Sequence, residues 1–244
     1  MNKLRRKPEI QAVAEGFHNS DLERSRSRLL SGKSYQNLST VWVTPIPSKM
    51  LSAKVVFESW LNLAMPMNQM VFRLPVIGME VGQAYEHAVE TILAHPQLST
   101  FKYMLTIEHD NMPPPDGLLK LYESIGDYDA VGGLYWTKGE MGQPMIYGNP
   151  NEMPRNFAPQ VPVPESLQPC NGLGMGFTLF KMEMFRKVPK PWFRTLQEWT
   201  PGEGMKGATQ DLFFFNNAAR EGFRFACDTR IKVGHMDLGS EMIW

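Results

Sequence analysis

The feature that most constrains the fold is a regular alternation of strand-like and helix-like segments in the first half of the chain. Four short segments are rich in β-branched and aromatic residues, and three segments of helical character separate them. The strand-like segments are "TVWVTPIP", "NQMVFRLPVIG", "FKYMLTI" and "YDAVGGLYW"; the helix-like ones are "SAKVVFESWLNLA", "GQAYEHAVETILAHP" and "GLLKLYESIG". This order predicts an α/β domain with a mostly parallel central sheet flanked by helices and joined by right-handed crossovers.

The second half of the chain has a different character. Residues 137–172 are rich in Pro, Asn and Gly, which predicts loops around short hairpin-like strands. A strand running into a helix ("GMGFTLFKMEMF"), a long loop, a helix ("DLFFFNNAAREG") and a terminal strand ("FRFACDTRIKVGH") are expected to follow. Residues 1–40 are expected to form a basic, helical N-terminal arm, and residues 41–244 the main domain.

Composition limits the class of protein. The chain has 244 residues, zero formal net charge and a pI near 7, so nothing in its global charge attracts nucleic acid or anionic membranes. Two cysteines form neither a zinc pattern nor a disulfide framework, and no apolar run has the length of a transmembrane segment. We therefore expect a cytoplasmic protein without a transmembrane segment.

Four polar residues stand where one apolar strand ends. The strand-like segment 101–107 is followed by Glu108, His109, Asp110 and Asn111, and then by three prolines. Residues two apart on a strand share a face, so Glu108 and Asp110 are expected to point the same way, with His109 opposite or at the bend. Paired carboxylates beyond a sheet edge suit Mg²⁺ or Mn²⁺. The alternative is an acidic turn that caps the next helix.

Three further signals are weak when taken singly. His235 ends the last strand, and such a histidine is more often simply hydrogen-bonded than a ligand. Asp211 begins a helix and could be its cap or a general base. The segment "CNGLGMGF" is followed by a strand, so it is not a dinucleotide fingerprint, which requires a helix at that point.

The order of these signals resembles the GT-A-type nucleotide-sugar glycosyltransferases, close to the pattern of glycosyltransferase family 2. In that pattern a strand ends in Asp-x-Asp before a proline turn and a helix, as in "IEHDNMPPPDGLLKLYE". A "GG" strand, a glycine-rich acceptor loop, an Asp-led helix and a final Gly-His strand end follow, as in "DAVGGLYW", "CNGLGMGFTLFKMEMFRKV", "TQDLFFFNNAAREGFRF" and "IKVGH". The likeness spans roughly residues 41–235.

The resemblance implies a function and a set of residues. It implies transfer of a sugar from a UDP- or GDP-sugar donor to an acceptor hydroxyl, that of a saccharide, with inversion and with Mn²⁺ or Mg²⁺ as cofactor. The base would be Asp211, and the metal site would consist of Asp110, His235 and Glu108. The donor site would contain Thr44, Pro45, Arg73, Glu108, His109 and Asp110. The sugar or acceptor site would contain Trp136, Gly174, Gly176, Trp192, Trp199 and Gln210. Glu108 and Gln210 depart from the family's usual residues.

Three alternatives stay open at this point. A sugar-nucleotide nucleotidyltransferase would need a glycine-rich loop after the first strand, where this chain has "VTPIPSKML". A non-catalytic sugar-nucleotide-binding module would be consistent with Glu108 in place of Asp. A glycosyltransferase acting on a modified base in DNA would use the basic arm. Trp192 and Trp199 could stack on sugars or serve as local hydrophobic anchors.

Overall fold

The computed structural model describes residues 37–48, 50–67, 69–200 and 204–244, with the backbone alone for 197–200 and 204–208. The chain divides into two units, Met1–Asn37 and Leu38–Trp244. The expected helical arm lies almost entirely outside the described residues. The fold described below is that of the second unit.

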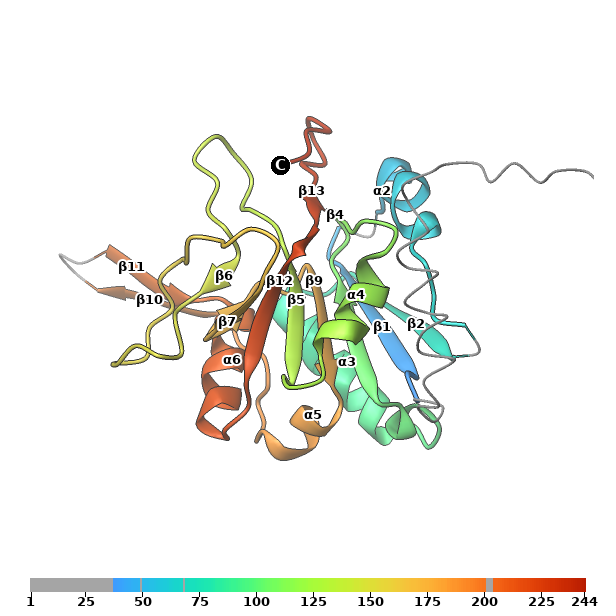
Figure 1. The fold of residues 1–244 in the computed structure, drawn as a ribbon, viewed down its shortest axis with the longest axis horizontal. Coiled ribbons are helices and arrows are strands. Elements are labelled where there is room, and N and C mark those ends of the chain that lie inside the picture. Colours follow the sequence, from blue (N-terminus) through green and yellow to red (C-terminus); the bar gives the residue numbers. More distant parts are fainter. Residues whose placement is uncertain (1–36, 49, 68, 201–203) are drawn as a thin grey trace, which may run out of the picture. The chain divides into compact units, whose positions relative to one another are not determined.

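A seven-stranded sheet forms the centre of this unit (Figure 1). The strand order is β2-β1-β3-β9-β5-β12-β7, with β1 Thr40–Ile46, β2 Val71–Ile77, β3 Tyr103–Ile107, β5 Ala130–Leu134, β7 Leu167–Cys170, β9 Phe177–Lys181 and β12 Phe225–Lys232. Strands β2, β1, β3, β5 and β12 run in one direction, and β9 and β7 run in the other. The prediction of a mixed α/β domain with a mostly parallel sheet is confirmed.

Helices cover both faces of the sheet. One apolar cluster joins the sheet to α3 Val81–Ala94, α5 Glu183–Lys187 and α6 Gln210–Arg220. The other joins it to α2 Ala53–Glu58, the 3-10 turn η1 Trp60–Asn62 and α4 Gly117–Ser124. A second 3-10 turn, η2, spans Leu98–Thr100 between α3 and β3. The strand-helix alternation read from residues 40–134 is therefore present, although the helix expected after β1 is short.

The run "LFFF" explains how α6 is held. Phe214 and Phe215 are fully buried and pack against Phe180 of β9, with ring centroids 5.7 and 5.9 Å apart. Phe214 also stacks on Phe193 at 4.9 Å. Buried aromatic pairs of this kind add stabilisation beyond their buried area. The first turn of α6, which carries Asp211, is thereby fixed against the sheet.

Strand β9 is the element whose position the sequence did not predict. It comes from the second half of the chain yet lies between β3 and β5, antiparallel to both. A Cβ on Gly132 of β5 would come within 2.7 Å of the Thr178 hydroxyl, so the glycine permits this close strand pairing. Because β9 is antiparallel, its first residues lie at the carboxyl ends of β3 and β5. The preceding glycine-rich segment is therefore brought to that edge of the sheet.

Three two-stranded ribbons complete the fold. β4 Asn111–Met112 pairs with β13 Gly234–His235, β6 Ile146–Tyr147 with β8 Gly172–Leu173, and β10 Leu196–Thr200 with β11 Gly204–Ala208. The β10–β11 ribbon falls in a segment that was expected to be a loop, and that expectation is wrong. The β4–β13 pair sets His235 directly opposite Asn111.

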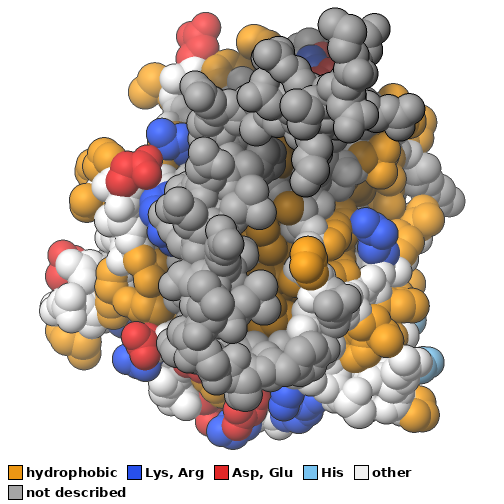
Figure 2. All heavy atoms as spheres, turned by 45° about the vertical axis from the view of Figure 1, so that its right-hand side comes forward, with side chains coloured by type: hydrophobic (Ala, Val, Ile, Leu, Met, Phe, Trp, Pro, Cys, Tyr) orange, Lys and Arg blue, Asp and Glu red, His pale blue; other side chains and the backbone are white. Residues whose placement is uncertain are grey.

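The side of the domain formed by α2 and the edge strand β2 exposes many large apolar side chains (Figure 2). They are Met50, Leu51, Phe57, Leu61, Met67, Met70, Phe72, Ile77 and Met79. None of the helices in the described parts of the chain is long and apolar enough to cross a membrane. Cys170 and Cys227 are both buried and free.

Candidate active site

Polar side chains from four parts of the chain gather at the carboxyl ends of the parallel strands. Glu108 and Asp110 follow β3, Lys138 follows β5, His235 follows β12, and Asp211 lies in the first turn of α6. In open α/β sheets this edge is where ligands bind. The structure therefore places His235 next to Asp110, and Glu108 near both Asp110 and Asp211; the sequence had singled out all four residues.

The residues after β3 form a turn, not a continued strand. The Asn111 amide donates to the Glu108 carbonyl at 3.0 Å, and His109 Nδ1 lies 3.9 Å from Asp110 Oδ1. His109 therefore lies at a bend, one of the two positions expected for it, but the expectation that Glu108 and Asp110 point the same way is wrong here. Instead, Glu108 faces Tyr85 of α3, whereas Asp110 faces Lys138 and His235.

Asp110 is the most strongly paired acid of the cluster. Its residue is 8% exposed, and its Oδ2 accepts from Lys138 Nζ at 2.5 Å and lies 3.6 Å from His235 Nε2. Burial alone would raise the pKa of Asp110, but the contacts with His235 and Lys138 outweigh burial and hold that pKa well below its ordinary value. Asp110 is therefore a carboxylate at neutral pH.

His235 is oriented in a way that suits a metal ligand. Its Nδ1 lies 2.7 Å from the Trp136 carbonyl, which can only accept, so Nδ1 carries the hydrogen and Nε2 faces Asp110. A carbonyl on the second ring nitrogen is the usual support of a ligating histidine. Two ligands on adjoining strand ends fit a cation that takes its other ligands from phosphate oxygens and water. Among the described residues, no group of three His, Cys, Asp or Glu side chains could hold a metal.

Glu108 lies in a different environment from Asp110. The Tyr85 hydroxyl donates to its Oε1 at 3.2 Å, and the Glu108 amide donates to the Gly176 carbonyl at 3.2 Å. Burial, and then repulsion from Asp110 and Asp211, raise the pKa of Glu108 to about 8. Burial also raises the pKa of Tyr85, which stays a donor. Glu108 is thus a poorly compensated acid beside the cluster.

Asp211 is 5% exposed, and its Oδ1 accepts from the Thr209 hydroxyl and from the Leu212 amide, the latter at 2.9 Å. A helix N-terminus favours the ionised form of a carboxylate. Burial instead outweighs these hydrogen bonds, and the pKa of Asp211 is raised above its ordinary value. A raised pKa makes a carboxylate a stronger proton acceptor, which suits a general base.

The glycine-rich segment before β9 closes this group from one side. The Gly176 amide donates to the Tyr135 hydroxyl at 2.8 Å, and a Cβ on Gly174 would come within 2.2 Å of the same hydroxyl. A Cβ on Gly176 would come within 2.5 Å of the Asn111 side chain. Asn111 is fully buried, and both polar atoms of its side chain lack a partner among the described residues. The glycines therefore permit a close approach to two polar groups.

The remaining donor-site predictions lie on β1 and β2. The Thr44 hydroxyl accepts from the Trp42 indole at 2.8 Å, and Pro45 is buried one residue further along β1. Arg73 is exposed near the middle of β2, with its guanidinium 5.0 Å from the Trp42 ring. These contacts tie Thr44 and Arg73 to Trp42, and they do not include the acids described above.

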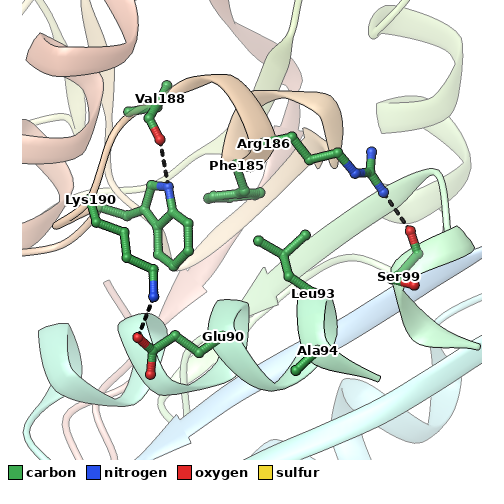
Figure 3. Close-up of a pocket in the computed structure, with 9 residues that line it drawn as sticks. Glu90, Leu93, Ala94, Ser99, Phe185, Arg186, Val188 and Lys190 are labelled. Atoms are coloured by element: carbon green, nitrogen blue, oxygen red, sulfur yellow. Dashed lines mark hydrogen bonds and ion pairs between the residues drawn. The ribbon is translucent and has the colours of Figure 1, made fainter. Parts of the chain in front are cut away.

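The predicted acceptor residues are divided in position. Gln210 starts α6 beside Asp211, and Trp136 contributes its carbonyl to His235. Trp192 does not join them: it is 4% exposed, and its indole donates to the Val188 carbonyl at 2.9 Å in a pocket lined by α3 and α5 residues (Figure 3). Its ring is buried as an anchor. Trp199 lies on β10, opposite Met205.

Four residues of the cluster were not predicted: Lys138, Tyr85, Tyr135 and Asn111. Lys138 had a signal, because a lysine next to a glycine follows directly on a strand end in "YWTKGE". Tyr85 and Tyr135 had none, since each lies within a run that reads as core. Asn111 stood in the quoted motif, but its burial depends on β13 and β9.

Comparison with solved structures identifies the fold. The crystal structure of A197 from STIV matches with a TM-score of 0.58 at 17% identity, over 84% of this chain and 92% of that one. Two structures of S. aureus TarS 1–349 match less well. The first has a TM-score of 0.43 at 10% identity and covers 80% of this chain and 60% of that one. The second, in complex with UDP-GlcNAc, has a TM-score of 0.39 at 9% identity and covers 80% and 58%.

No protein-family model matches the chain, and no curated protein matches it in sequence. The likeness to A197 shows a shared fold that extends over most of both chains. Membership of glycosyltransferase family 2 and the GT-A details of the fold stay predictions.

Proposed function

We propose that the protein transfers a glycosyl group from a nucleoside diphosphate sugar to an acceptor hydroxyl. The observation that carries the proposal is the arrangement of acids at the strand ends. A strongly paired carboxylate, Asp110, lies beside a ligand-oriented histidine, while a buried acid with a raised pKa, Asp211, heads a well-packed helix. Asp110 and the histidine suit a cation that would offset the charge of the diphosphate. Asp211 suits a proton transfer.

Asp211 is the proposed base of the reaction. A sugar hydroxyl is a poor nucleophile at neutral pH, so its proton must pass to a positioned acceptor as its oxygen attacks. In the proposed step the acceptor oxygen bonds to the anomeric carbon, and its proton moves to the Asp211 carboxylate. The bond from that carbon to the diphosphate oxygen breaks, and the diphosphate leaves with the electron pair. Displacement in line inverts the anomeric carbon. Asp237 is the next candidate for the base, followed by Glu203, which lies outside the described residues.

Asp110 and His235 are the residues that would hold Mn²⁺ or Mg²⁺. Such an ion supplies positive charge next to the leaving diphosphate. Their opposed placement, with His235 held by the Trp136 carbonyl, supports this assignment. Glu108, which follows the same strand as Asp110, and Tyr85 of α3 would contact the donor's ribose or sugar. Thr44, Pro45, Arg73 and His109 remain proposed donor contacts, and Trp136, Gly174, Gly176 and Gln210 proposed acceptor contacts.

The test is a screen of UDP-, GDP- and TDP-sugars by thermal shift, with and without Mn²⁺, followed by assay of nucleoside diphosphate release. A ligand that binds the native state alone must raise the melting temperature. We expect one donor class to raise it in the presence of Mn²⁺ and to be hydrolysed slowly. If a donor binds but no nucleoside diphosphate is released from it with any acceptor, the protein is a non-catalytic binding module. The absence of any shift would contradict the proposal.

A further inference from the structure

Lys138 lies at the centre of the proposed donor site, although no part of the proposed chemistry has used it. Its ammonium contacts Asp110 Oδ2 at 2.5 Å, on the carboxylate proposed to ligate a metal ion. We propose that Lys138 is a built-in cation of this site: it neutralises Asp110 in the free protein and binds the donor's diphosphate. This inference rests on the proposed function and assigns a diphosphate-binding residue within it.

The position of Lys138 is set by a folded hairpin. Residues 136–144 turn back on themselves: Trp136 and Pro144 form an antiparallel bridge, the Thr137 amide donates to the Gln143 carbonyl at 2.9 Å, and the Gly142 amide donates to the Gly139 carbonyl at 3.0 Å. Gly139 has a φ of +104°, a conformation that glycine tolerates and other residues avoid. Lys138 therefore projects from an ordered turn.

The same hairpin positions both groups that approach Oδ2 of Asp110. The Trp136 carbonyl holds the His235 ring, and two residues later Lys138 reaches the carboxylate itself. His235 Nε2 and Lys138 Nζ approach the same oxygen, Oδ2, at 3.6 and 2.5 Å. An ammonium at that oxygen and a metal ion bound to it would occupy overlapping space. The lysine and a divalent cation therefore compete for Asp110.

The local charge explains why a cation is needed there. Glu108, Asp110 and Asp211 lie near one another, and Lys138 is a cation that interacts with both Glu108 and Asp110. Lys138 is therefore placed to offset the repulsion between these acids and an incoming diphosphate. The Lys138 side chain is 30% exposed, so its head group is accessible from solvent. Lysine is a flexible point charge that binds phosphate well, so it can leave Asp110 for an incoming diphosphate.

The consequence is a pair of opposite effects on replacing Lys138. Lys138→Gln should weaken binding of UDP or GDP in EDTA about tenfold or more, since it removes a charge-assisted contact to phosphate. The same change should tighten binding of Mn²⁺ alone, because the metal no longer competes with an ammonium for Oδ2. A lysine with a merely structural role would not produce this reversal of sign.

The experiment measures the dissociation constants of UDP and GDP in EDTA, and of Mn²⁺ without nucleotide, for wild type and Lys138→Gln. Lys187→Gln is the matched control, because Lys187 is also ion-paired, 2.7 Å from Glu183, but lies on α5. We expect the control to match wild type in both titrations. Lys138→Arg, which keeps the charge, should restore much of the nucleotide affinity in EDTA.

The outcomes separate this inference from the proposed function. If wild type binds nucleotide with Mn²⁺ but not in EDTA, or if Lys138→Gln binds it in EDTA as tightly as wild type, Lys138 is not a diphosphate ligand and the proposed function stands. If Lys138→Gln weakens nucleotide and Mn²⁺ together, the lysine merely supports the fold of the site, and the inference fails. If wild type binds no nucleotide under any condition, both fall.

Discussion

Two groups of buried acids in this domain differ in how completely they are paired. Asp228 of β12 is fully buried, and its two oxygens accept from Arg230 at 2.8 and 2.6 Å and from Ser124 at 2.7 Å. At the strand ends Asp110 is paired with Lys138, but Glu108 and Asp211 have weaker donors: Glu108 faces a tyrosine, and Asp211 a threonine and an amide. The two groups occupy different regions of the same sheet.

The pKa values follow this difference. At Asp228, hydrogen bonds from Arg230 and Ser124 outweigh the effect of burial, and its pKa is lowered. At Glu108 and Asp211 burial dominates, and both pKa values are raised. A fully paired acid contributes stability, whereas a buried acid left poorly paired costs stability. Acids of the second kind cluster at functional sites, because their chemistry depends on that environment.

The sharpest test of the comparison is Asp211→Asn. The amide keeps the shape and part of the hydrogen bonding of Asp211 but cannot accept the proton, so turnover should fall about 10²- to 10⁴-fold. The melting temperature should stay close to that of wild type or rise, since a buried charge is removed. Steady-state kinetics with the donor found by screening, together with thermal unfolding, measures both. Near-normal turnover would reduce Asp211 to a residue that caps its helix.

The opposite profile is expected for Asp228→Ala. Arg230 and Ser124 lose their partner, and a cavity forms beside α4, so the free energy of unfolding should fall by about 2–3 kcal/mol. At a temperature where the variant is folded, its turnover should be that of wild type. Urea unfolding and kinetics on the same preparation provide the comparison. A variant as stable as wild type would show that this pair is not structural.

A smaller effect is expected for Tyr85→Phe. The change removes the hydroxyl that donates to Glu108 at 3.2 Å and leaves the aromatic contact with Phe193, whose centroid is 5.4 Å away. The free energy of unfolding should therefore change by only about 1 kcal/mol. Donor affinity should weaken in step, if Glu108 contacts the donor. Titration of the donor into the variant tests this, and unchanged affinity would remove Tyr85 and Glu108 from the donor site.

The pH dependence of stability should differ in sign between the two groups. The pKa of Glu108 is about 8 in the folded protein and 4.5 ordinarily, so the native state holds a proton that the unfolded chain has lost. Its contribution to stability therefore falls as pH rises from about 4.5 to 8. Asp228 behaves oppositely: its contribution is present above its ordinary pKa of 3.8 and is lost as pH falls through its lowered value.

Urea midpoints measured at pH 5 and pH 8 separate these contributions. From pH 5 to pH 8, the Glu108→Gln variant should lose less stability than wild type does. At pH 8 the variant should be more stable than wild type. Asp228→Asn should leave that difference unchanged, since Asp228 is ionised at both. Equal losses in wild type and Glu108→Gln would show that Glu108 is ordinarily ionised throughout.

The sequence predicted the parts of this fold that depend on local pattern. The strand-helix alternation and the polar end of β3 could be predicted, because the spacing of apolar residues and the positions of prolines are local features of the sequence. The insertion of β9 between β3 and β5 was not, because it depends on pairing across more than 40 residues. The directions of Glu108 and Asp110 were predicted wrongly, because the alternation of a strand was extended past Ile107, where β3 ends.

The site followed the same rule. Asp110, Asp211 and His235 were found from their places at the ends of elements; the structure pairs Asp110 with His235 and places both Asp110 and Asp211 near Glu108. Tyr85 and Tyr135 could not be found, because a hydroxyl aimed into a site looks the same in sequence as a core tyrosine. Trp192, which the sequence allowed either to stack on a sugar or to anchor the fold, is buried against α5 as an anchor.

The central claim is that the strand-end acids, and not the paired Asp228, form a nucleotide-sugar site. The most direct measurement is calorimetric titration of the donor, with Mn²⁺, into wild type, Asp110→Ala and Asp228→Asn at a temperature where all three are folded. We predict that Asp110→Ala loses donor binding by at least about tenfold, while Asp228→Asn binds as wild type does. Equal donor affinity in Asp110→Ala and wild type would contradict the account.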